Sequence, residues 1–322
     1  MSTRLAAADL SDLDRAQDRE LLIGNGLGGY TALSPIGAPG RRYHGLLVAA
    51  LQPPVARTVL AGPPMLWART GADWLPLFSF EIEPGTFAPR LGAPLRAVEV
   101  GVGGISKAWA LPGGTLTERI AALPGANAVV LGLQLDAAAT DGVDLLLRLT
   151  ATAHDHHDAR VGDVSVAQVS VDADARRGSW RSGPEWPTVQ VGCEGGSLAP
   201  DAGSIRGLFH RHDAARVEAD RSDYAVPLRW SVRLEPGDAA HLVVATESGG
   251  AGRAPDEVLA TLAQQGGAAL LAECASHDRA LLERASRVGD GADAAVARSP
   301  ELQSLVLAAD GFLVRQIGRA HV

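Results

Sequence analysis

The sequence predicts a mainly β protein, a large antiparallel β-sandwich (a super-sandwich) followed by a helical segment. From about residue 40 to residue 247, short β-like runs alternate with clusters of Gly, Pro, Asp and Asn, which favour turns. Many runs place apolar residues at every second position, as Leu145, Leu147 and Leu149 do, so that one strand face is buried. No segment of helical period separates the runs, and we expect successive strands to pair antiparallel in two stacked sheets.

A glycine-rich loop precedes these strands. The stretch GNGLGGY nominally matches the dinucleotide-binding pattern G-x-G-x-x-G at Gly24, Gly26 and Gly29. Such a site needs a helix that begins at the glycines and an acidic residue about 20 positions later. Residues 35–40 contain two prolines and two glycines, and no Asp or Glu occurs between residues 21 and 72. The sequence therefore argues against a nucleotide site here.

The loop instead carries side chains that suit a sugar. Planar amides and guanidinium groups donate hydrogen bonds to hydroxyls, and the apolar face of a pyranose packs against an aromatic ring. Six residues are the candidate substrate-binding side chains: Asn25, Tyr30, Arg41, Arg42, Tyr43 and His44. In the alternative interpretation, the tyrosines belong to the core and the arginines pair with structural carboxylates.

Helices are predicted after the strands. Residues 255–288 are rich in Ala, Leu and Glu, with Pro255 suited to a first helical position and a break at residues 266–267. Residues 299–316 predict one amphipathic helix that opens with Ser299 as its N-cap. Its apolar stripe has no following segment to pack against, so we expect the chain to be truncated before a further all-α domain. Residues 317–322 read like a translated sequencing-adapter tail.

Composition narrows the class of partner. The formal net charge is −8, and no Lys or Arg run is longer than a pair, which argues against nucleic acid. The first twenty residues lack the apolar region of a secretory signal, and no stretch approaches membrane-spanning length, so we expect a cytoplasmic protein without membrane contact. Cys193 and Cys274 are 81 positions apart, without metal-site spacing, and are expected as buried or free thiols.

Two blocks near the start of the chain form a signature. The first is Glu20 followed by NGLGGY at residues 25–30, and the second, ten residues later, is RRYHGLLVA at residues 41–49. Together they closely resemble the N-terminal signature of the bacterial and archaeal glycogen debranching enzymes, the amylo-α-1,6-glucosidase family. The segment SLVLAADGFLVR at residues 304–315 looks like the first helix of that family's catalytic domain. Leu21 departs from the family, which usually has Trp there.

The resemblance implies a fold and an activity. Family members join an N-terminal β-sandwich to a C-terminal (α/α)6 barrel that holds the catalytic carboxylates, and they hydrolyse α-1,6-linked glucose at branch stubs of glycogen or related α-glucans. The catalytic carboxylates would then lie beyond residue 322, and we assign no catalytic residue, cofactor or metal to this chain. The implied partners are an α-glucan and the chain's own C-terminal barrel.

The combined reading divides the chain into five segments. They are an N-terminal tail (1–18), the β-sandwich (19–248), a helical linker (249–298), the first helix of the barrel (299–316) and the adapter tail (317–322).

Other clusters of polar or aromatic residues have structural interpretations as well as functional ones. The stretch HDHHD at residues 154–158 could supply two metal ligands but is typical of a solvated strand end. Glu81 and Glu83 are expected to be structural or exposed. Trp180 and Trp186 lie in a Gly-, Pro- and Arg-rich stretch, where an indole either stacks on a sugar or packs at the sandwich edge.

Two other functions remain open at this stage. One is a stand-alone carbohydrate-binding or assembly module that has no barrel. The other is a related α-glucan hydrolase or phosphorylase with the same sandwich-plus-barrel plan, which only the catalytic carboxylates or a phosphate site would distinguish.

Overall fold

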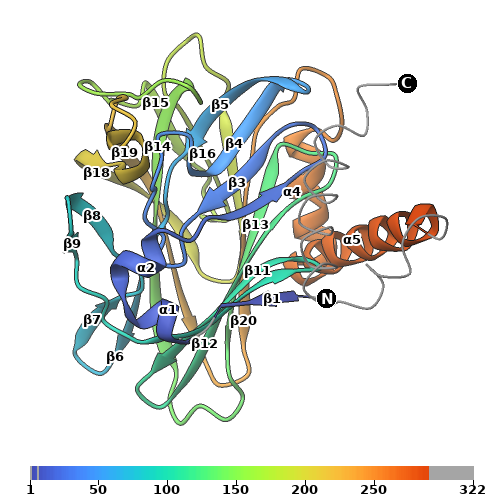
Figure 1. The fold of residues 1–322 in the computed structure, drawn as a ribbon. Coiled ribbons are helices and arrows are strands. Elements are labelled where there is room, and N and C mark those ends of the chain that lie inside the picture. The colour runs from blue at the N-terminus through green and yellow to red at the C-terminus, as the bar shows by residue number, and fades with distance from the viewer. Residues whose placement is uncertain (1, 6, 290–322) are drawn as a thin grey trace.

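The computed structural model describes residues 2–5 and 7–289, and within them two nine-stranded antiparallel sheets form a sandwich (Figure 1). The first sheet contains, in spatial order, β1 (Ser2–Arg4), β10 (Leu95–Gly101), β11 (Gly104–Leu111), β12 (Gly114–Ala122), β13 (Ala128–Leu135), β20 (Ala239–Ala245), β17 (Val189–Glu194), β16 (Arg177–Arg181) and β15 (Gln168–Val171). The predicted mainly β architecture with antiparallel sheets is confirmed.

The second sheet contains the strands that flank the signature loops. Its strands, in spatial order, are β18 (Ser197–Phe209), β19 (Arg221–Leu234), β14 (Val143–Asp155), β5 (Val55–Ala61), β4 (Gly45–Gln52), β3 (Tyr30–Leu33) and β2 (Leu21–Gly24). Two further strands, β6 (Met65–Thr70) and β7 (Asp73–Pro76), join it beside β14, and β8 (Phe80–Glu83) pairs with β9 (Thr86–Ala88) in a separate hairpin.

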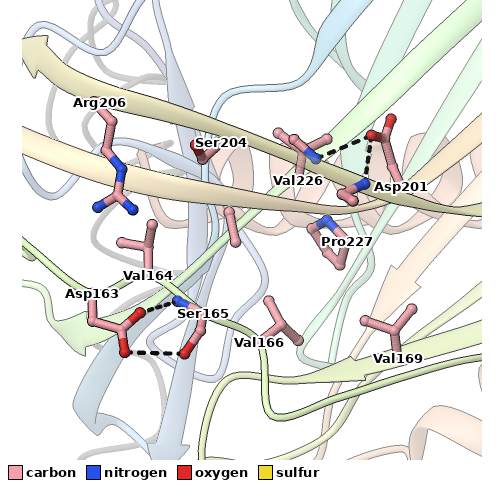
Figure 2. Close-up of a pocket in the computed structure, with 13 residues that line it drawn as sticks. Asp163, Val164, Ser165, Val166, Val169, Asp201, Ser204, Arg206, Val226 and Pro227 are labelled. Carbon is pink, nitrogen blue, oxygen red and sulfur yellow. Dashed lines mark hydrogen bonds between the residues drawn. The ribbon is translucent and has the colours of Figure 1, made fainter.

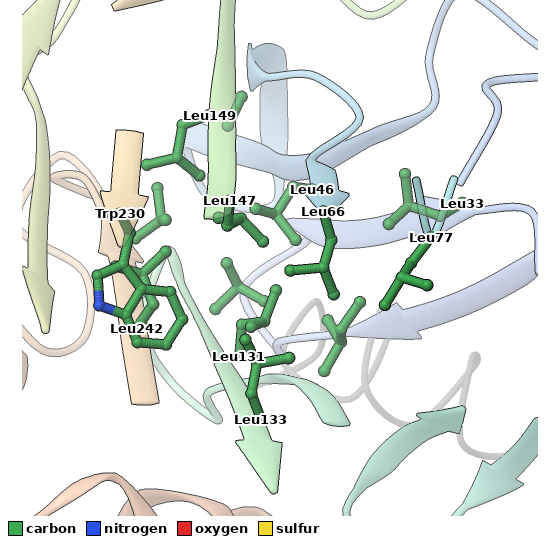
Figure 3. Packing of buried hydrophobic residues seen from close by; sticks show 14 of the residues in the cluster. Leu33, Leu46, Leu66, Leu77, Leu131, Leu133, Leu147, Leu149, Trp230 and Leu242 are labelled. Carbon is green, nitrogen blue, oxygen red and sulfur yellow. The ribbon is translucent and has the colours of Figure 1, made fainter. Parts of the chain in front are cut away.

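The main core lies between the two sheets. Figure 3 shows Leu131 and Leu133 of β13 packed with Leu147 of β14 and with Trp230 of β19. Trp230 is 0% exposed, as is Trp109 on β11, so both indoles are core residues. Each buried leucine contributes about 1.5–3 kcal/mol by leaving water, and this face-to-face burial holds the sheets together.

A pair of helices covers the outer face of the first sheet. Helices α4 (Pro255–Gln265) and α5 (Gly267–Gly289) pack against β12, β13, β17 and β20 (Figure 1). Val130 and Val243 point away from the sandwich core and contact Leu259 and Leu270 of these helices in a second apolar cluster. Gly266, at φ +81°, ends α4 at the predicted break. The segment expected as a linker therefore packs onto the first sheet through α4 and the first half of α5.

Residues 2–5 and 7–18, in the segment expected as a tail, also belong to the fold. Strand β1 pairs with β10 at the edge of the first sheet. The short helices α1 (Ala7–Ser11) and α2 (Leu13–Gln17) follow, and Asp12 caps α2 by accepting hydrogen bonds from the backbone of Asp14 and Arg15.

None of the helices within residues 2–5 and 7–289 is long and apolar enough to cross a membrane.

Two local features differ from what the sequence pattern alone suggests. Val164 and Val166 alternate as strand residues do, but β15 begins only at Gln168, so both valines lie in the segment before it. Trp180 is not an exposed indole, because β16 pairs with both β15 and β17 and places this ring in the core at 1% exposure. Trp186 is partly buried against the same core. The expected helix at 299–316 and the tail at 317–322 lie outside the described residues.

Candidate functional site

The glycine motif forms a hairpin turn. Strands β2 and β3 pair antiparallel on either side of it, and the Asn25 amide donates a hydrogen bond to the Gly29 carbonyl at 3.0 Å. Gly28 has φ +99°, and a Cβ there would lie 2.4 Å from the Pro54 carbonyl oxygen, so only glycine fits. Since a strand and not a helix begins at Tyr30, this turn lacks the helix N-terminus that a dinucleotide site requires.

Asn25 fastens this turn to the rest of the sandwich. Its Nδ2 donates to the Ala126 carbonyl at 2.8 Å and to Asn127 Oδ1 at 3.0 Å, and its Oδ1 accepts from the Leu27 amide at 2.9 Å. Asn127 in turn hydrogen-bonds both backbone groups of Ala50 on β4. Both asparagines are at most 3% exposed, and this pair therefore joins three chain segments.

Tyr30 connects the two signature blocks. Its hydroxyl donates to the Tyr43 carbonyl at 3.0 Å, and the residue is 8% exposed. Burial raises the pKa of the Tyr30 phenol well above its usual value of 10, so the hydroxyl stays protonated and can donate. The contact fixes the backbone of the second block against the first.

Glu20 binds two side chains of the second block. Arg41 Nε donates to its Oε1, and His44 Nε2 lies 3.4 Å from the same oxygen. His44 is 2% exposed, and its Nδ1 accepts a hydrogen bond from the Gly40 amide at 3.2 Å. The hydrogen bond from His44, and after it the one from Arg41, lower the pKa of Glu20 to about 2 although burial opposes this change.

Arg42 is held by the short helix α3 (Arg211–Ala214) and the loops beside it. Its backbone amide donates to Asp213 Oδ2 at 2.6 Å, and its guanidinium donates to Glu218 at 2.5 Å and to the His157 carbonyl at 2.5 Å. Asp213 is 0% exposed. These partners lie more than 110 positions from Arg42 in the sequence, so the sequence could not reveal this contact.

Helix α3 is itself fixed by a charge network. Arg211 forms two hydrogen bonds with Glu81, at 2.6 and 2.7 Å, and further ion pairs with Asp14 and Asp18. Glu81 is 2% exposed, so it is structural, as expected. Glu83 pairs at the surface with Arg221 at 2.7 Å.

Tyr43 is the partly exposed aromatic ring of the signature. The Arg41 guanidinium lies 5.6 Å from the centre of its ring, and the His44 ring meets it edge-on. Burial raises the pKa of the Tyr43 phenol. Arg41 and Arg42 are also partly buried, with side chains 15% and 13% exposed. The second block thus presents one ring and parts of two guanidinium groups, which suit recognition and not proton transfer.

Buried polar atoms without hydrogen bonds gather beside the second block. Neither amide atom of Gln17, which is 1% exposed, nor Nε2 of His212 makes a hydrogen bond, and Nη1 of Arg41 makes none. A Cβ on Gly40 would lie 3.8 Å from Gln17 Nε2 and 2.9 Å from the His212 ring. Each such group costs about 1–3 kcal/mol, a cost that natural proteins accept mainly at functional sites.

Sequence reasoning missed three contributors to this site. Gln17 falls in the segment expected as a tail, and His212 and Asp213 lie on α3, far along the chain. None of the three lies in either signature block, so the sequence pattern did not place them beside it.

The histidine stretch at the end of β14 has no metal-site geometry. His154 is 6% exposed and its Nδ1 lies 2.8 Å from the Asp155 carbonyl oxygen, while the ring centres of His156 and His157 are 3.9 Å apart and the ring planes are tilted by 40°. Within residues 2–5 and 7–289, no three His, Cys, Asp or Glu side chains are placed to hold a metal ion. Cys193 and Cys274 are both buried and form no disulfide.

Comparison with known proteins places this site in context. Residues 19–241, more than half of the chain and including both signature blocks, match the family described as glycogen debranching enzyme N terminal. No curated protein matches the chain. A solved polysaccharide lyase aligns with 10% sequence identity and a TM-score of 0.33, over 72% of this chain and 33% of the lyase. The chain thus spans about a third of that lyase, and a likeness this weak carries no argument.

Proposed function

The chain belongs to the glycogen debranching enzyme N-terminal family, and from this premise we propose that it is the N-terminal sandwich of a glycoside hydrolase that cleaves α-1,6-glucosidic branch points. The substrate is glycogen or a related α-glucan. The sandwich shapes the glucan site and packs against a C-terminal (α/α)6 barrel. A cytoplasmic location is part of this proposal.

One observation supports this role most strongly. The two signature blocks that fall within the family match share one network, in which Tyr30 binds the Tyr43 backbone and Glu20 binds Arg41 and His44. This network holds the ring of Tyr43 and the guanidinium groups of Arg41 and Arg42 in one place, partly exposed. A rigid arrangement of this kind is what a sugar-binding surface requires, because little side-chain entropy is lost on binding.

Hydrolysis itself is assigned to groups outside the chain. Cleavage of a glycosidic bond needs a carboxylic acid that protonates the leaving oxygen and a carboxylate that activates water or attacks the anomeric carbon. In the described residues, Glu20, Glu81 and Asp213 are ion-paired to arginines that also hold the signature or helix α3 in place. We therefore assign them structural roles and place the catalytic pair in the barrel.

Three of the six signature residues remain candidates for direct glucan contact. Arg41, Arg42 and Tyr43 are partly exposed, whereas Asn25, Tyr30 and His44 are buried and bonded within the protein. We propose that the exposed three line the glucan end of the site or the face that meets the barrel, and that the buried three hold them there.

The test uses the full product of the native gene, cloned from genomic DNA, with a glycogen limit dextrin whose branches end in single α-1,6-linked glucose stubs. We expect free glucose as the product, without a requirement for phosphate. Glucose 1-phosphate formed only with phosphate would favour the phosphorylase alternative. Glycogen binding with no release of sugar would contradict the proposed hydrolase and favour a binding module.

A further inference from the structure

A groove with a volume of about 300 Å³ opens where the edge strands of the two sheets approach each other (Figure 2). One wall is the segment 163–169, which leads into β15. The other consists of residues 201–206 of β18 and residues 225–227 of β19. The three segments are far apart in the sequence, so no sequence motif predicts this groove.

The floor of the groove is apolar. Val164 and Val226 are 3% and 2% exposed, and Pro227 lies beside them. Val166 and Val169 are partly exposed and extend this surface along the wall (Figure 2). Such a floor suits the C–H face of a sugar ring, which is apolar.

Two bulges in β18 place charged side chains at the rim. Between Pro200 and Gly203, and again between Ile205 and Leu208, β18 advances three residues while β19 advances two. Each bulge contains one charged residue that lines the groove, Asp201 in the first and Arg206 in the second. A β-bulge redirects side chains locally and is common beside binding sites. The two bulges are therefore consistent with a binding site at this edge.

Hydrogen bonds to Arg148 and Asp223 hold the two bulges in place. Asp201 accepts two hydrogen bonds from Arg148, at 2.7 and 2.8 Å, and a Cβ on Gly203 would lie only 2.2 Å from Arg148 Nη2. Asp223, 5% exposed, accepts from the amides of Gly207 at 2.6 Å and Gly162 at 2.8 Å. The groove therefore keeps its shape without a ligand.

The charges of the groove favour a neutral ligand. Its only charged lining residues are Asp163, Asp201 and Arg206, two acids and one base. Arg206 is already paired with Asp223 at 3.2 Å, so no unpaired cation is available to attract a phosphate or carboxylate. Carboxylate oxygens, the Ser204 hydroxyl and a guanidinium around an apolar floor together match a hydroxyl-rich, uncharged molecule.

The loop between β14 and β15, residues 156–167, connects the groove to the signature. Arg42 donates a hydrogen bond to the His157 carbonyl near the start of this loop, and the Asp223 amide donates to the Arg160 carbonyl at 2.7 Å. The same loop then reaches Asp163 and Val164 in the wall of the groove. A polymer held at the groove would therefore lie on a rigid extension of the signature surface.

We propose that this groove is a second glucan-binding site, which takes a short segment of neutral α-1,4-linked glucose units. The identity of the sugar rests on the proposed function, whereas the preference for a neutral hydroxyl-rich ligand rests on the groove itself. The site would hold a chain of the same branched polymer away from the bond that is cleaved.

The test is a titration of the 322-residue chain with maltohexaose, followed through the NMR signals of valine methyl groups. We expect the methyl signals of Val166, Val169 and Val226 to shift, and cellohexaose, with β-1,4 linkages, to shift them less. Ser204→Trp should block the groove and abolish these shifts. Ser197→Trp is the matched control, because Ser197 is an exposed serine on the same strand outside the groove, and it should bind as the wild type does.

A milder variant guards against misfolding of the tryptophan variant. Asp163→Ala removes one rim acceptor from an exposed position and should weaken maltohexaose binding about threefold to tenfold, the value of one hydrogen bond. Maltohexaose that leaves the three valine signals unmoved, or that binds Ser204→Trp as tightly as the wild type, would overturn the proposal.

The NMR titration and the limit-dextrin assay test the two proposals independently. Valine shifts without glucose release by the native gene product would support the groove and overturn the hydrolase. Glucose release without valine shifts would support the hydrolase and overturn the groove.

Discussion

The two blocks of the signature differ in what their side chains do. In the first, Asn25 and Tyr30 are at most 8% exposed, and their polar groups bond within the protein. In the second, Arg41, Arg42 and Tyr43 are held by hydrogen bonds and ion pairs but remain partly exposed. A single motif thus combines a joint that fixes the fold with a surface that is available to a ligand. The chemistry of a residue type alone does not say which of these roles it has.

The largest expected effect on stability is at the structural joint, the hydrogen-bonded pair Asn25 and Asn127. Asn127→Ala removes four hydrogen bonds that Asn127 makes with Asn25, Ala50 and Glu247, and it leaves several buried groups unpaired. We expect the free energy of unfolding to fall by about 3–5 kcal/mol, measured by urea denaturation. Gln134→Ala, at an exposed position on β13, is the control and should change little. A loss below about 1 kcal/mol for Asn127→Ala would show that the joint is not structural.

An intermediate effect is expected where the two roles meet, at Glu20. Its folded-state pKa of about 2 lies below the ordinary 4.5, so the carboxylate stabilises the fold above pH 4.5 and loses this contribution as the pH falls toward 2. The side chain is 37% exposed, and after solvent screening we expect Glu20→Gln to cost about 1 kcal/mol at pH 7. The difference between wild type and variant should vanish near pH 2. A difference that stays constant from pH 7 to pH 2 would rule out this ion-pair contribution.

The smallest effect is expected at an exposed ion pair far from both roles. Glu83 pairs with Arg221 at 2.7 Å, but the Glu83 side chain is 63% exposed. We expect Glu83→Gln to change the free energy of unfolding by less than about 0.5 kcal/mol, again by urea denaturation. A loss as large as that of Glu20→Gln would mean that burial does not separate the two classes of ion pair.

The sequence was informative about local patterns and silent about distant contacts. Alternation along β14 and the Ala- and Leu-rich segment after residue 254 follow directly from periodicity, so the sheets and the helices α4 and α5 were predictable. For Trp180 the sequence left both sugar stacking and packing open, because its Gly- and Arg-rich surroundings resemble a loop. Only its pairing with β15 and β17 shows that it is buried.

The same limit applies to the candidate site. The six signature residues could be named from two short stretches, but their exposure could not. The Arg42 contacts with Asp213 and Glu218 span 171 and 176 positions, and the groove combines three separate segments. Such contacts depend on how β18 and β19 fold back onto the first strands, and no local pattern records that.

The division of the signature is tested most directly at Tyr43, in the full product of the native gene acting on a limit dextrin. We expect Tyr43→Ala to lower kcat/KM about threefold to tenfold, the value of one aromatic contact, while the thermal midpoint changes by less than about 3 °C. Tyr43→Phe keeps the ring and should retain near-normal activity. Unchanged kcat/KM in Tyr43→Ala would contradict a role for this surface in glucan recognition.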